Sequence, residues 1–383
     1  MYKIYKKGSV KYKILLFAQL DENIVIEYNL VESGDIMKVA IIGTGNIASV
    51  HAGAIKKLGH ELCIAVNKNI DSANIFAKHW GIKNTYSSIE ELLCRDDFDV
   101  AHICSPPSYH YEQIKACLLA GKHVISEKPL CVENAQAEEL TSLAEEKHLV
   151  NAVCFNNRFY KANLVARNEL FTQKINLIKA SYLQSFHCMP TEYTWRYVDE
   201  PAGRMRAVTE IGTHVIDLIL FITGKKVLAL SSLFIKSNKR RHIENGLMYP
   251  DPQGEIQVNS EDAAVINLIL ENGVIANIVV SEISHGKINE LKYRVDCDEK
   301  SLCWNSENPN NLNISDKKAK LIPMKCDPSE FNDTFVKLFK NVYDNIEGKG
   351  TPIYSTFRDA SYIVKICNAI YDSASKNGEY IKL

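Results

Sequence analysis

Residues 41–48 read Ile-Ile-Gly-Thr-Gly-Asn-Ile-Ala and follow directly on an apolar run. Gly43 permits a tight turn at the end of a strand, and Gly45 lets the backbone approach a pyrophosphate with no Cβ in the way. Asn46 and Ile47 then open a helix whose free N–H groups suit a phosphate. A lone G-x-G-x-x-A pattern is a weak signal, but its place between a strand and a helix predicts a nucleotide site.

Length and composition describe an ordinary globular protein. The chain has 383 residues, a formal net charge of -1, 46% hydrophobic residues and 24% charged residues, which is enough for two domains with sizeable cores. The near-neutral net charge gives no electrostatic reason to expect nucleic acid or an anionic membrane as a partner. No run of the sequence approaches the roughly 18 apolar residues of a membrane span. The 11 cysteines form no C-x-x-C pair and no zinc spacing. We therefore expect reduced thiols, a cytoplasmic protein and no metal site.

Residues 1–36 fit poorly with the rest, because residues 37–39 (Met-Lys-Val) are the usual opening of a nucleotide-binding domain. The lysine-rich start and the apolar run 14–20 resemble a signal peptide. However, the run is short, no small-residue cleavage site follows it, and two acidic residues come next. We expect no export, and we assign this N-terminal extension no function. It is either an added hairpin, pairing 12–17 with 24–28, or translation from an upstream start.

From residue 37 onward, strand and helix patterns alternate. Strands are predicted at 38–42, 62–66, 99–104, 123–127 and 149–154, and helices at 47–58, 71–79, 108–120 and 134–147. A further short helix is predicted to run from a capping box, Ser87-x-x-Glu90, to residue 93. Strands separated by helical runs imply a parallel sheet covered on both faces. The pattern predicts an α/β dinucleotide-binding Rossmann domain over residues 37–155.

The pattern changes after residue 156. Predicted strands are 177–187, 227–236, 262–270, 274–283, 290–297 and 301–304, with helices at 206–222, 329–346 and 357–374. Asn272-Gly273 lies between two strand-like runs and predicts a type I′ hairpin. Successive strands with helices set apart predict an α+β domain over residues 156–383, with a largely antiparallel open sheet.

The predicted strands 264–270 and 274–280 are apolar on both faces. A sheet with one solvated face should alternate apolar and polar residues cleanly, but Ile266 and Ile278 alternate with Val265, Ile269 and Val279. Something must therefore cover the second face. A second copy of the chain is the simplest candidate, so we expect a homodimer or homotetramer through this sheet.

The second motif is Ser126-Glu127-Lys128-Pro129, at the end of a predicted strand. Ligands of open α/β sheets bind beyond the carboxyl ends of the strands, so Lys128 would point to where a nicotinamide ring lies. Pro129 restricts Lys128 to extended backbone geometry. The alternative is a surface lysine in a turn.

The third motif is Thr209-Glu210-Ile211-Gly212-Thr213-His214-Val215-Ile216-Asp217. In a helix, Glu210, His214 and Asp217 are at i, i+4 and i+7 and share one face. Alcohol oxidation needs a base for the hydroxyl proton, and histidine suits that role at neutral pH. A nearby carboxylate can orient the ring. The alternative is a structural histidine with an acidic neighbour.

The three motifs follow one another at intervals of about 80 residues, across a change of fold. In this order they resemble the Gfo/Idh/MocA family, which includes glucose–fructose oxidoreductase and inositol dehydrogenase. The resemblance runs from residue 37 to the C-terminus. It includes the loop 104–110 (Cys-Ser-Pro-Pro-Ser-Tyr-His), similar to the family's loop beside the nicotinamide ribose, and Trp195-Arg196. Residues 281–286 and 302–307 look like those of a subgroup acting on sugars and glycosides.

The resemblance implies that the Rossmann domain binds NAD or NADP and that the second domain contributes substrate contacts and the subunit interface. It implies catalytic roles for Lys128 and His214, with Glu210 orienting the histidine, although many members have aspartate at that position. The cofactor-binding residues expected are Gly43, Gly45, Asn46, Ile47, Asn67, Lys68, Ser105, Pro106, His110, Glu127 and Lys128. The substrate-binding residues expected are Lys128, Arg158, Trp195, Arg196, His214 and Asp217.

The choice between NAD and NADP stays open. The strand after the first helix ends Ala65-Val66-Asn67-Lys68, where NAD-specific folds place a carboxylate on the ribose 2′-hydroxyl. No carboxylate is present, so Lys68 either faces a 2′-phosphate or only covers the adenine.

Three functions fit these residues. The leading one is a dehydrogenase that moves hydride between NAD(P) and a secondary hydroxyl of a sugar, cyclitol or glycoside. The second is an enzyme whose tightly held NAD oxidises the substrate transiently, for net glycoside cleavage, elimination or isomerisation. The third is a non-catalytic nucleotide-binding regulator, which the presence of both Lys128 and His214 disfavours.

Overall fold

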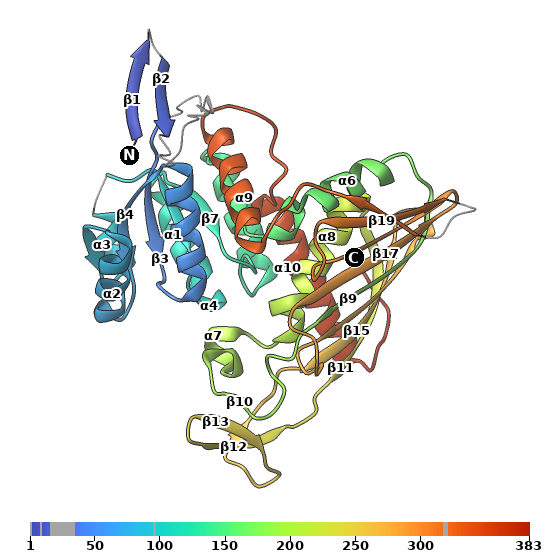
Figure 1. Ribbon diagram of the computed structural model, residues 1–383. Helices are drawn as coiled ribbons and strands as arrows, with labels where there is room; N and C mark the ends of the chain where they lie inside the picture. Colours follow the sequence, from blue (N-terminus) through green and yellow to red (C-terminus); the bar gives the residue numbers. More distant parts are fainter. Residues whose placement is uncertain (1, 8–9, 16–34, 95–96, 317–320) are drawn as a thin grey trace, which may run out of the picture.

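The computed structural model describes residues 2–7, 10–15, 35–94, 97–316 and 321–383. Near the N-terminus, β1 (Tyr2–Lys7) pairs with β2 (Val10–Leu15) as an antiparallel hairpin (Figure 1). The first strand of the hairpin expected from the sequence, 12–17, overlaps β2, and its expected partner 24–28 lies outside the described residues.

The first domain is a doubly wound Rossmann domain, as predicted. Its elements are β3 (Lys38–Ile42), α1 (Asn46–Leu58), β4 (Glu61–Val66), α2 (Ile70–Trp80), β5 (Asn84–Tyr86), α3 (Ile89–Leu93), β6 (Val100–Ile103), α4 (Pro107–Leu119), β7 (His123–Ser126), α5 (Asn134–Glu146) and β8 (Asn151–Val153). The six strands are parallel in the order β5-β4-β3-β6-β7-β8. The strand order reverses between β3 and β6, and ligands of such sheets bind at that point.

Local signals explain the helix ends of this domain. The side chain of Asn69 caps α2 by accepting hydrogen bonds from the N–H groups of Asp71 and Ser72, and α1 stops at Gly59, whose φ is 83°. The residue that caps the N-terminus of α3 lies one position later than predicted. Ser88, not Ser87, is the N-cap, and its hydroxyl accepts from the N–H of Glu91.

The second domain is an α+β domain built on one large sheet, also as predicted. The nine-stranded sheet consists of β9 (Ile175–Leu183), β11 (Val227–Ile235), β15 (Ala263–Leu270), β16 (Ile275–Ser281), β17 (Glu290–Cys297), β18 (Lys300–Asn305), β19 (Asn311–Asp316), β20 (Ile322–Lys325) and β21 (Ile381–Lys382). All neighbours pair antiparallel except β9 and β16, which are parallel. The hairpin between β15 and β16 has Asn272 and Gly273 at positive φ as expected, but Leu270 pairs with Val274 around three loop residues instead of two.

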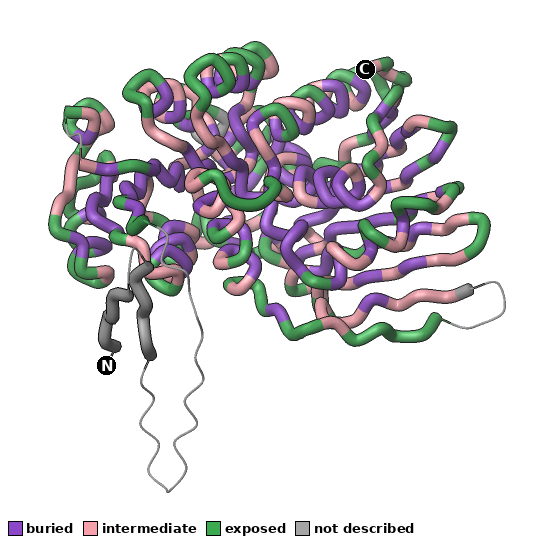
Figure 2. The backbone as a smooth tube through the Cα atoms, turned by 90° about the horizontal axis from the view of Figure 1, so that it is seen from above, coloured by how far each residue is buried: buried purple, intermediate pink, exposed green. Residues whose placement is uncertain are grey.

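Helices cover one face of this sheet. They are α6 (Lys161–Leu170), α8 (Thr213–Thr223) and α10 (Phe357–Ser375), and they share one core cluster with the strands. Figure 2 shows the buried backbone, in purple, gathered in the interior of the molecule. The opposite face has no helix on it among the described residues. There Ile275 is 50% exposed, whereas Ile278 on the covered face is 0% exposed.

Two parts of the second segment differ from the predicted layout. Helix α9 (Phe331–Ile346) packs on α1, and its Phe339 and Tyr343 belong to a core cluster of the Rossmann domain. The strands β10 (Thr191–Glu192), β12 (Arg240–Glu244), β13 (Leu247–Pro250) and β14 (Ile256–Gln257) form a small separate sheet that projects below the molecule in Figure 1. No helix of the described residues is long and apolar enough to cross a membrane.

Candidate functional site

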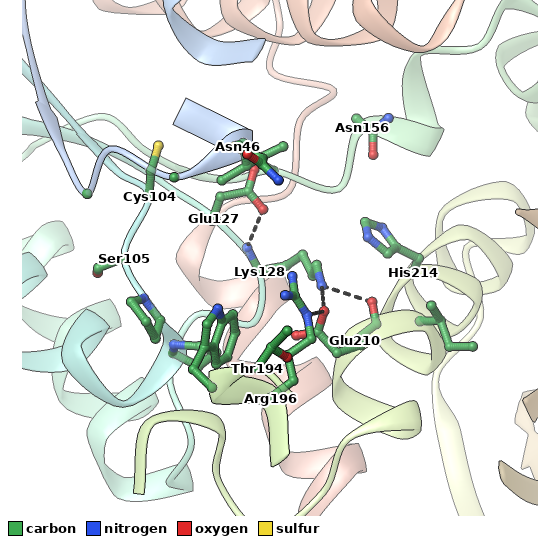
Figure 3. Close-up of a pocket in the computed structure, with 18 of the residues that line it drawn as sticks. Asn46, Cys104, Ser105, Glu127, Lys128, Asn156, Thr194, Arg196, Glu210 and His214 are labelled. Atoms are coloured by element: carbon green, nitrogen blue, oxygen red, sulfur yellow. Dashed lines mark hydrogen bonds and ion pairs between the residues drawn. The ribbon is translucent and has the colours of Figure 1, made fainter. Parts of the chain in front are cut away.

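A cleft of about 1690 Å³ opens beyond the carboxyl ends of the Rossmann strands and continues against the second domain. Of the residues predicted for the site, these line it: Gly43, Gly45, Asn46, Ile47, Asn67, Lys68, Ser105, Pro106, Glu127, Lys128, Trp195, Arg196, Glu210 and His214. The other three, His110, Arg158 and Asp217, are not in its lining. The three sequence motifs thus meet in one place, and Figure 3 shows their central part.

The glycine turn at the end of β3 has the geometry that a dinucleotide requires. Gly43 has a φ of 92°, and a Cβ there would lie 2.6 Å from the backbone of Cys104 and Ser105, so glycine is obligatory. A Cβ on Gly45 would meet no protein atom within 4 Å, which leaves space that a pyrophosphate can fill. Helix α1 has no side-chain cap at Gly45, so the N–H groups of Asn46 and Ile47 are available to an anion. These residues fit a dinucleotide cofactor.

The end of β4 carries Asn67 and Lys68 at the far side of this turn. The amide of Asn67 donates to the hydroxyl of Thr44 at 2.6 Å, and its carbonyl oxygen accepts from the N–H of Asn69 at 2.9 Å. Asn67 therefore joins the glycine turn to the start of α2. Lys68 is exposed, and no described residue forms an ion pair with it.

The loop after β6 brings Ser105 and Pro106 to the cleft, while His110 lies behind them. His110 is fully buried, and its two ring nitrogens lie 2.8 Å from the carbonyl oxygens of Ser105 and Pro129. Burial lowers the pKa of His110 against the opposing effect of these contacts. His110 thus joins two cleft-lining loops and does not contact the cleft itself, contrary to its expected role.

Glu127 is held from inside the Rossmann domain. His51 Nε2 lies 3.0 Å from Glu127 Oε1, and the chain continues through His102, 2.9 Å from His51, to the hydroxyl of Tyr343, 2.8 Å from His102. Burial acts to raise the pKa of Glu127, but the contact with His51 and the charge of Lys128 lower it below the usual range. His51, Glu127 and Cys154 are also close enough to hold a metal ion. Because His51 and Glu127 already bond to each other in this chain, we assign the group to structure.

Lys128 lies at the centre of the catalytic candidates. Its Nζ donates to the main-chain carbonyl of Glu210 at 2.9 Å and lies 3.6 Å from the Glu210 carboxylate, which also accepts from Arg196 Nε at 3.0 Å (Figure 3). Burial acts to raise the pKa of Glu210, but Lys128 and Arg196 outweigh it and lower the value to about 2. Glu210 is therefore ionised and paired with two cations. It is not hydrogen-bonded to His214, so the expected orienting contact is not formed.

His214 begins the apolar part of α8 and points into the cleft beside Lys128 (Figure 3). Its ring packs against Phe155 and Tyr182, with centroids 5.8 and 6.2 Å away. Its Nδ1 is buried and has no hydrogen-bond partner among the described residues. Burial and the charge of Lys128 lower its pKa to about 3, so the imidazole is neutral near pH 7. A neutral imidazole that lines the cleft is suited to exchange a proton with a bound hydroxyl.

A turn of π-helix, Val208–Gly212, carries Glu210 into this position. The buried carboxylate of Glu261 accepts hydrogen bonds from the N–H groups of Arg206 and Val208 and so satisfies the start of the turn. The wider π-turn changes the angular spacing that an α-helix would give. Glu210 and His214 both reach the cleft, and Asp217 does not.

Asp217 and Arg158 form a buried ion pair with each other and do not line the cleft. Arg158 Nη2 and Nε donate to the Asp217 carboxylate at 2.5 and 2.9 Å, and Asp217 is only 1% exposed. The pair joins α8 to the 3-10 turn Asn156–Phe159 that follows β8. Both residues were expected in the substrate site, and their place behind it corrects that expectation.

Several polar cleft residues were not predicted at all. They lie near the ends of β9 and β16 and in the loops that follow: Tyr182, Gln184, His187, Glu282 and Asn289. Gln184 donates to Asn289 at 2.6 Å. Because β9 and β16 are parallel, their carboxyl ends meet at the same sheet edge. These residues were not predicted because the sequence does not reveal that the two distant strands pair in parallel.

Comparisons with known proteins agree with this geometry. One family description, "Oxidoreductase family, NAD-binding Rossmann fold", matches residues 37–155, and a second, "Oxidoreductase family, C-terminal alpha/beta domain", matches residues 172–383. Levoglucosan dehydrogenase from Pseudarthrobacter phenanthrenivorans is 26% identical over 302 residues, which are 73% of this chain and 76% of that protein. The scyllo-inositol 2-dehydrogenase (NADP(+)) of Bacillus subtilis is 23% identical over 367 residues, 89% of this chain and 95% of that protein.

A solved structure of levoglucosan dehydrogenase in complex with NADH and L-sorbose has a TM-score of 0.83 to this chain, with 22% identity over 90% of this chain and 98% of that one. At this identity the likeness shows the fold. The two family matches together span most of both domains. The chain therefore belongs to the Gfo/Idh/MocA family of NAD-binding oxidoreductases.

Proposed function

We propose that this protein is an NAD(P)-dependent dehydrogenase that oxidises a secondary hydroxyl of a neutral sugar, cyclitol or glycoside. The observation that carries the proposal is the meeting of Lys128 and His214 in the cleft that the glycine turn opens. Lys128 donates a hydrogen bond there, and the imidazole of His214 is neutral because its pKa is lowered to about 3. A substrate hydroxyl between them would accept from Lys128 and pass its proton to His214.

The bound nicotinamide would supply the hydride acceptor. In the oxidation, the C–H bond of the carbinol breaks with its electron pair, and the O–H proton leaves to the neutral imidazole. Lys128 stabilises negative charge on the oxygen as it develops. Trp195, with the Arg196 guanidinium 4.5 Å from its ring, also lines the cleft, and its flat apolar surface suits the C–H face of a sugar ring.

The charge of the cleft supports a neutral substrate. Among the described lining residues the lysines and arginines are Lys68, Lys128 and Arg196. Lys68 is on the cofactor side, and the other two are paired with Glu210. A phosphate or carboxylate on the substrate would find no unpaired lysine or arginine among these lining residues.

The test is a panel of neutral sugars, cyclitols, glycosides and sugar phosphates, each with NAD⁺ and NADP⁺, followed by absorbance of the reduced nicotinamide. We expect oxidation of at least one neutral compound and none of its phosphate ester. Turnover of phosphorylated compounds alone would contradict the neutral substrate. Cofactor that survives gel filtration, with substrate consumed and no reduced nicotinamide accumulating, would indicate transient oxidation instead.

We also infer that the chain forms at least a homodimer through the open face of the large sheet. That face presents Leu233, 55% exposed, and Ile275, 50% exposed, beside Val265 and Val279. Monomers rarely leave such a contiguous apolar surface in water. A second copy would cover it through a self-complementary interface, the commonest way in which proteins close an assembly.

A cytoplasmic location is the last part of the proposal. All 11 cysteines are free thiols, and six of them are buried. This thiol usage is typical of a reducing compartment.

A further inference from the structure

Two buried groups, His187 and Glu282, face each other across a gap at the substrate end of the cleft. Glu282 follows β16, and His187 is in the loop after β9, so the parallel pairing of these strands brings both to one edge. The N–H of His187 donates to the carbonyl of Glu282 at 3.0 Å. The two residues are 8% and 1% exposed, and both line the cleft.

The two side chains are spaced so that one oxygen atom, lying to the side of the line that joins them, can contact both. His187 Nε2 and Glu282 Oε1 are 3.9 Å apart, which is too long for a hydrogen bond between them. An oxygen about 2.8 Å from both atoms would be at normal hydrogen-bonding distance from each. A hydroxyl group can accept one hydrogen bond and donate another at the same time.

Neighbouring residues fix what each side of the gap offers. The other ring nitrogen of His187, Nδ1, is hydrogen-bonded to the hydroxyl of Tyr197. The ring of Tyr197 packs against the guanidinium groups of Arg206 and Arg241, at 4.6 and 4.9 Å. Arg241 also acts as a hydrogen-bond donor to the hydroxyl of Tyr197, so the hydrogen of that hydroxyl is free for His187 Nδ1. Burial and nearby arginines lower the pKa of His187 to about 3, so the ring is neutral and its one N–H is on Nε2, facing the gap.

The acceptor side is fixed in the same way. Burial raises the pKa of Glu282 to about 7, and the charge of Arg206 opposes this shift. Arg206 Nε donates to Glu282 Oε2 at 2.7 Å, which leaves Oε1 for the gap. Arg206 also pairs with Asp262, and Asp262 accepts from Arg241 at 3.1 Å. The donor and the acceptor are thus both held in place by buried groups before any substrate binds.

We propose that one hydroxyl of the substrate, different from the one that is oxidised, binds between His187 Nε2 and Glu282 Oε1. It accepts a hydrogen bond from the imidazole and donates one to the carboxylate. This subsite makes His187 and Glu282 specificity-determining residues for polyhydroxylated rings, and it rests on the proposed sugar-type substrate. A ring that lacks the hydroxyl leaves a buried donor and a buried acceptor unpaired, and sites of this kind reject such analogues strongly.

The experiment measures binding and not turnover. A Lys128→Met background with NADH bound is titrated calorimetrically with levoglucosan, L-sorbose, scyllo-inositol, glucose and the single-deoxy glucoses. We expect one deoxy position to weaken binding by about 10²-fold relative to the parent ring. In Glu282→Gln and His187→Phe variants of the same background, that discrimination should fall to within about threefold, while discrimination at the other positions stays unchanged.

The readout is a ratio of affinities within one variant, so a partly unfolded preparation does not alter it. His285→Phe and Glu255→Gln serve as matched controls, because both residues are exposed and neither lines the cleft. Unchanged discrimination in both cleft variants would overturn the subsite, and so would the absence of binding by every probe. Binding with the predicted ratios but no turnover by the unmutated enzyme would uphold the subsite and refute the proposed oxidation instead.

Discussion

Replacing Glu210 by glutamine should destabilise the protein by about 3 kcal/mol at pH 7. The pKa of Glu210 is held at about 2, against an ordinary value of 4.5, because Lys128 and Arg196 outweigh the effect of its burial. One pKa unit corresponds to about 1.4 kcal/mol between the two protonation states, and glutamine resembles the neutral state. For a chain of 383 residues the unfolding entropy is about 0.8 kcal/mol/K, so the loss should lower Tm by about 4 °C.

The pH dependence of this loss has a defined sign. A carboxylate with a depressed pKa in the folded state stabilises above its unfolded pKa, and this stabilisation is lost as pH falls toward its folded pKa. The gap between the unmutated protein and Glu210→Gln should therefore be constant from pH 7 to pH 5 and smaller by about 1.4 kcal/mol at pH 3.5. Differential scanning calorimetry measures both. Glu192→Gln, an exposed carboxylate at the cleft, is the control. An equal Tm for Glu210→Gln and the unmutated protein at pH 7 would refute the ion-pair reasoning.

Three further outcomes are expected. Lys128→Met should lower kcat by about 10²-fold and leave NADH affinity, measured by fluorescence, within about threefold, because the glycine turn holds the pyrophosphate; near-normal turnover would remove Lys128 from the chemistry. Lys68→Glu should lower the kcat/KM ratio of NADP⁺ over NAD⁺ by about 10-fold or more, since a carboxylate repels a 2′-phosphate; an unchanged ratio would place Lys68 away from the ribose. Ile275→Lys should weaken the dimer by about 10²-fold or more in sedimentation, because each two-fold interface would then bury two unpaired ammonium groups. The control Ile322→Lys on β20 should leave the dimer intact. A monomeric unmutated protein at micromolar concentration would contradict the interface.

Much of the fold followed from signals that are local in the sequence. The turn at Gly43, the periodic helices and the alternating strand–helix order are each set within a few residues, and they predicted the Rossmann domain. The large sheet was predicted because its strands are mostly successive. By contrast, the small sheet with β12 and β13 was missed, since its strands are short and polar and hydrophobic periodicity hardly marks them.

The errors at the site have a different cause, because each depends on a contact between distant segments. An α-helical spacing placed Asp217 on the face of Glu210 and His214, but its ion pair with Arg158 holds it behind the cleft. Glu261, which caps the π-turn that carries Glu210, lies about 50 positions further along the chain. Similarly, His187 and Glu282 meet only because β9 and β16 pair in parallel. Sequence spacing identifies residues on one element, but it does not show which elements will be neighbours.

The presence of glutamate at position 210, where many relatives have aspartate, can be understood from these contacts. Lys128 is bound by the main-chain carbonyl of Glu210 at 2.9 Å, and this contact does not depend on the side chain. The carboxylate lies beyond it, 3.0 Å from Arg196 Nε and 3.6 Å from Lys128 Nζ. Glu210 therefore contacts Lys128 by its backbone carbonyl and reaches Arg196 by its side chain. His214 is left without a carboxylate partner, and burial keeps it neutral. The carboxylate of Glu210 thus joins Lys128 to Arg196 and does not contact His214.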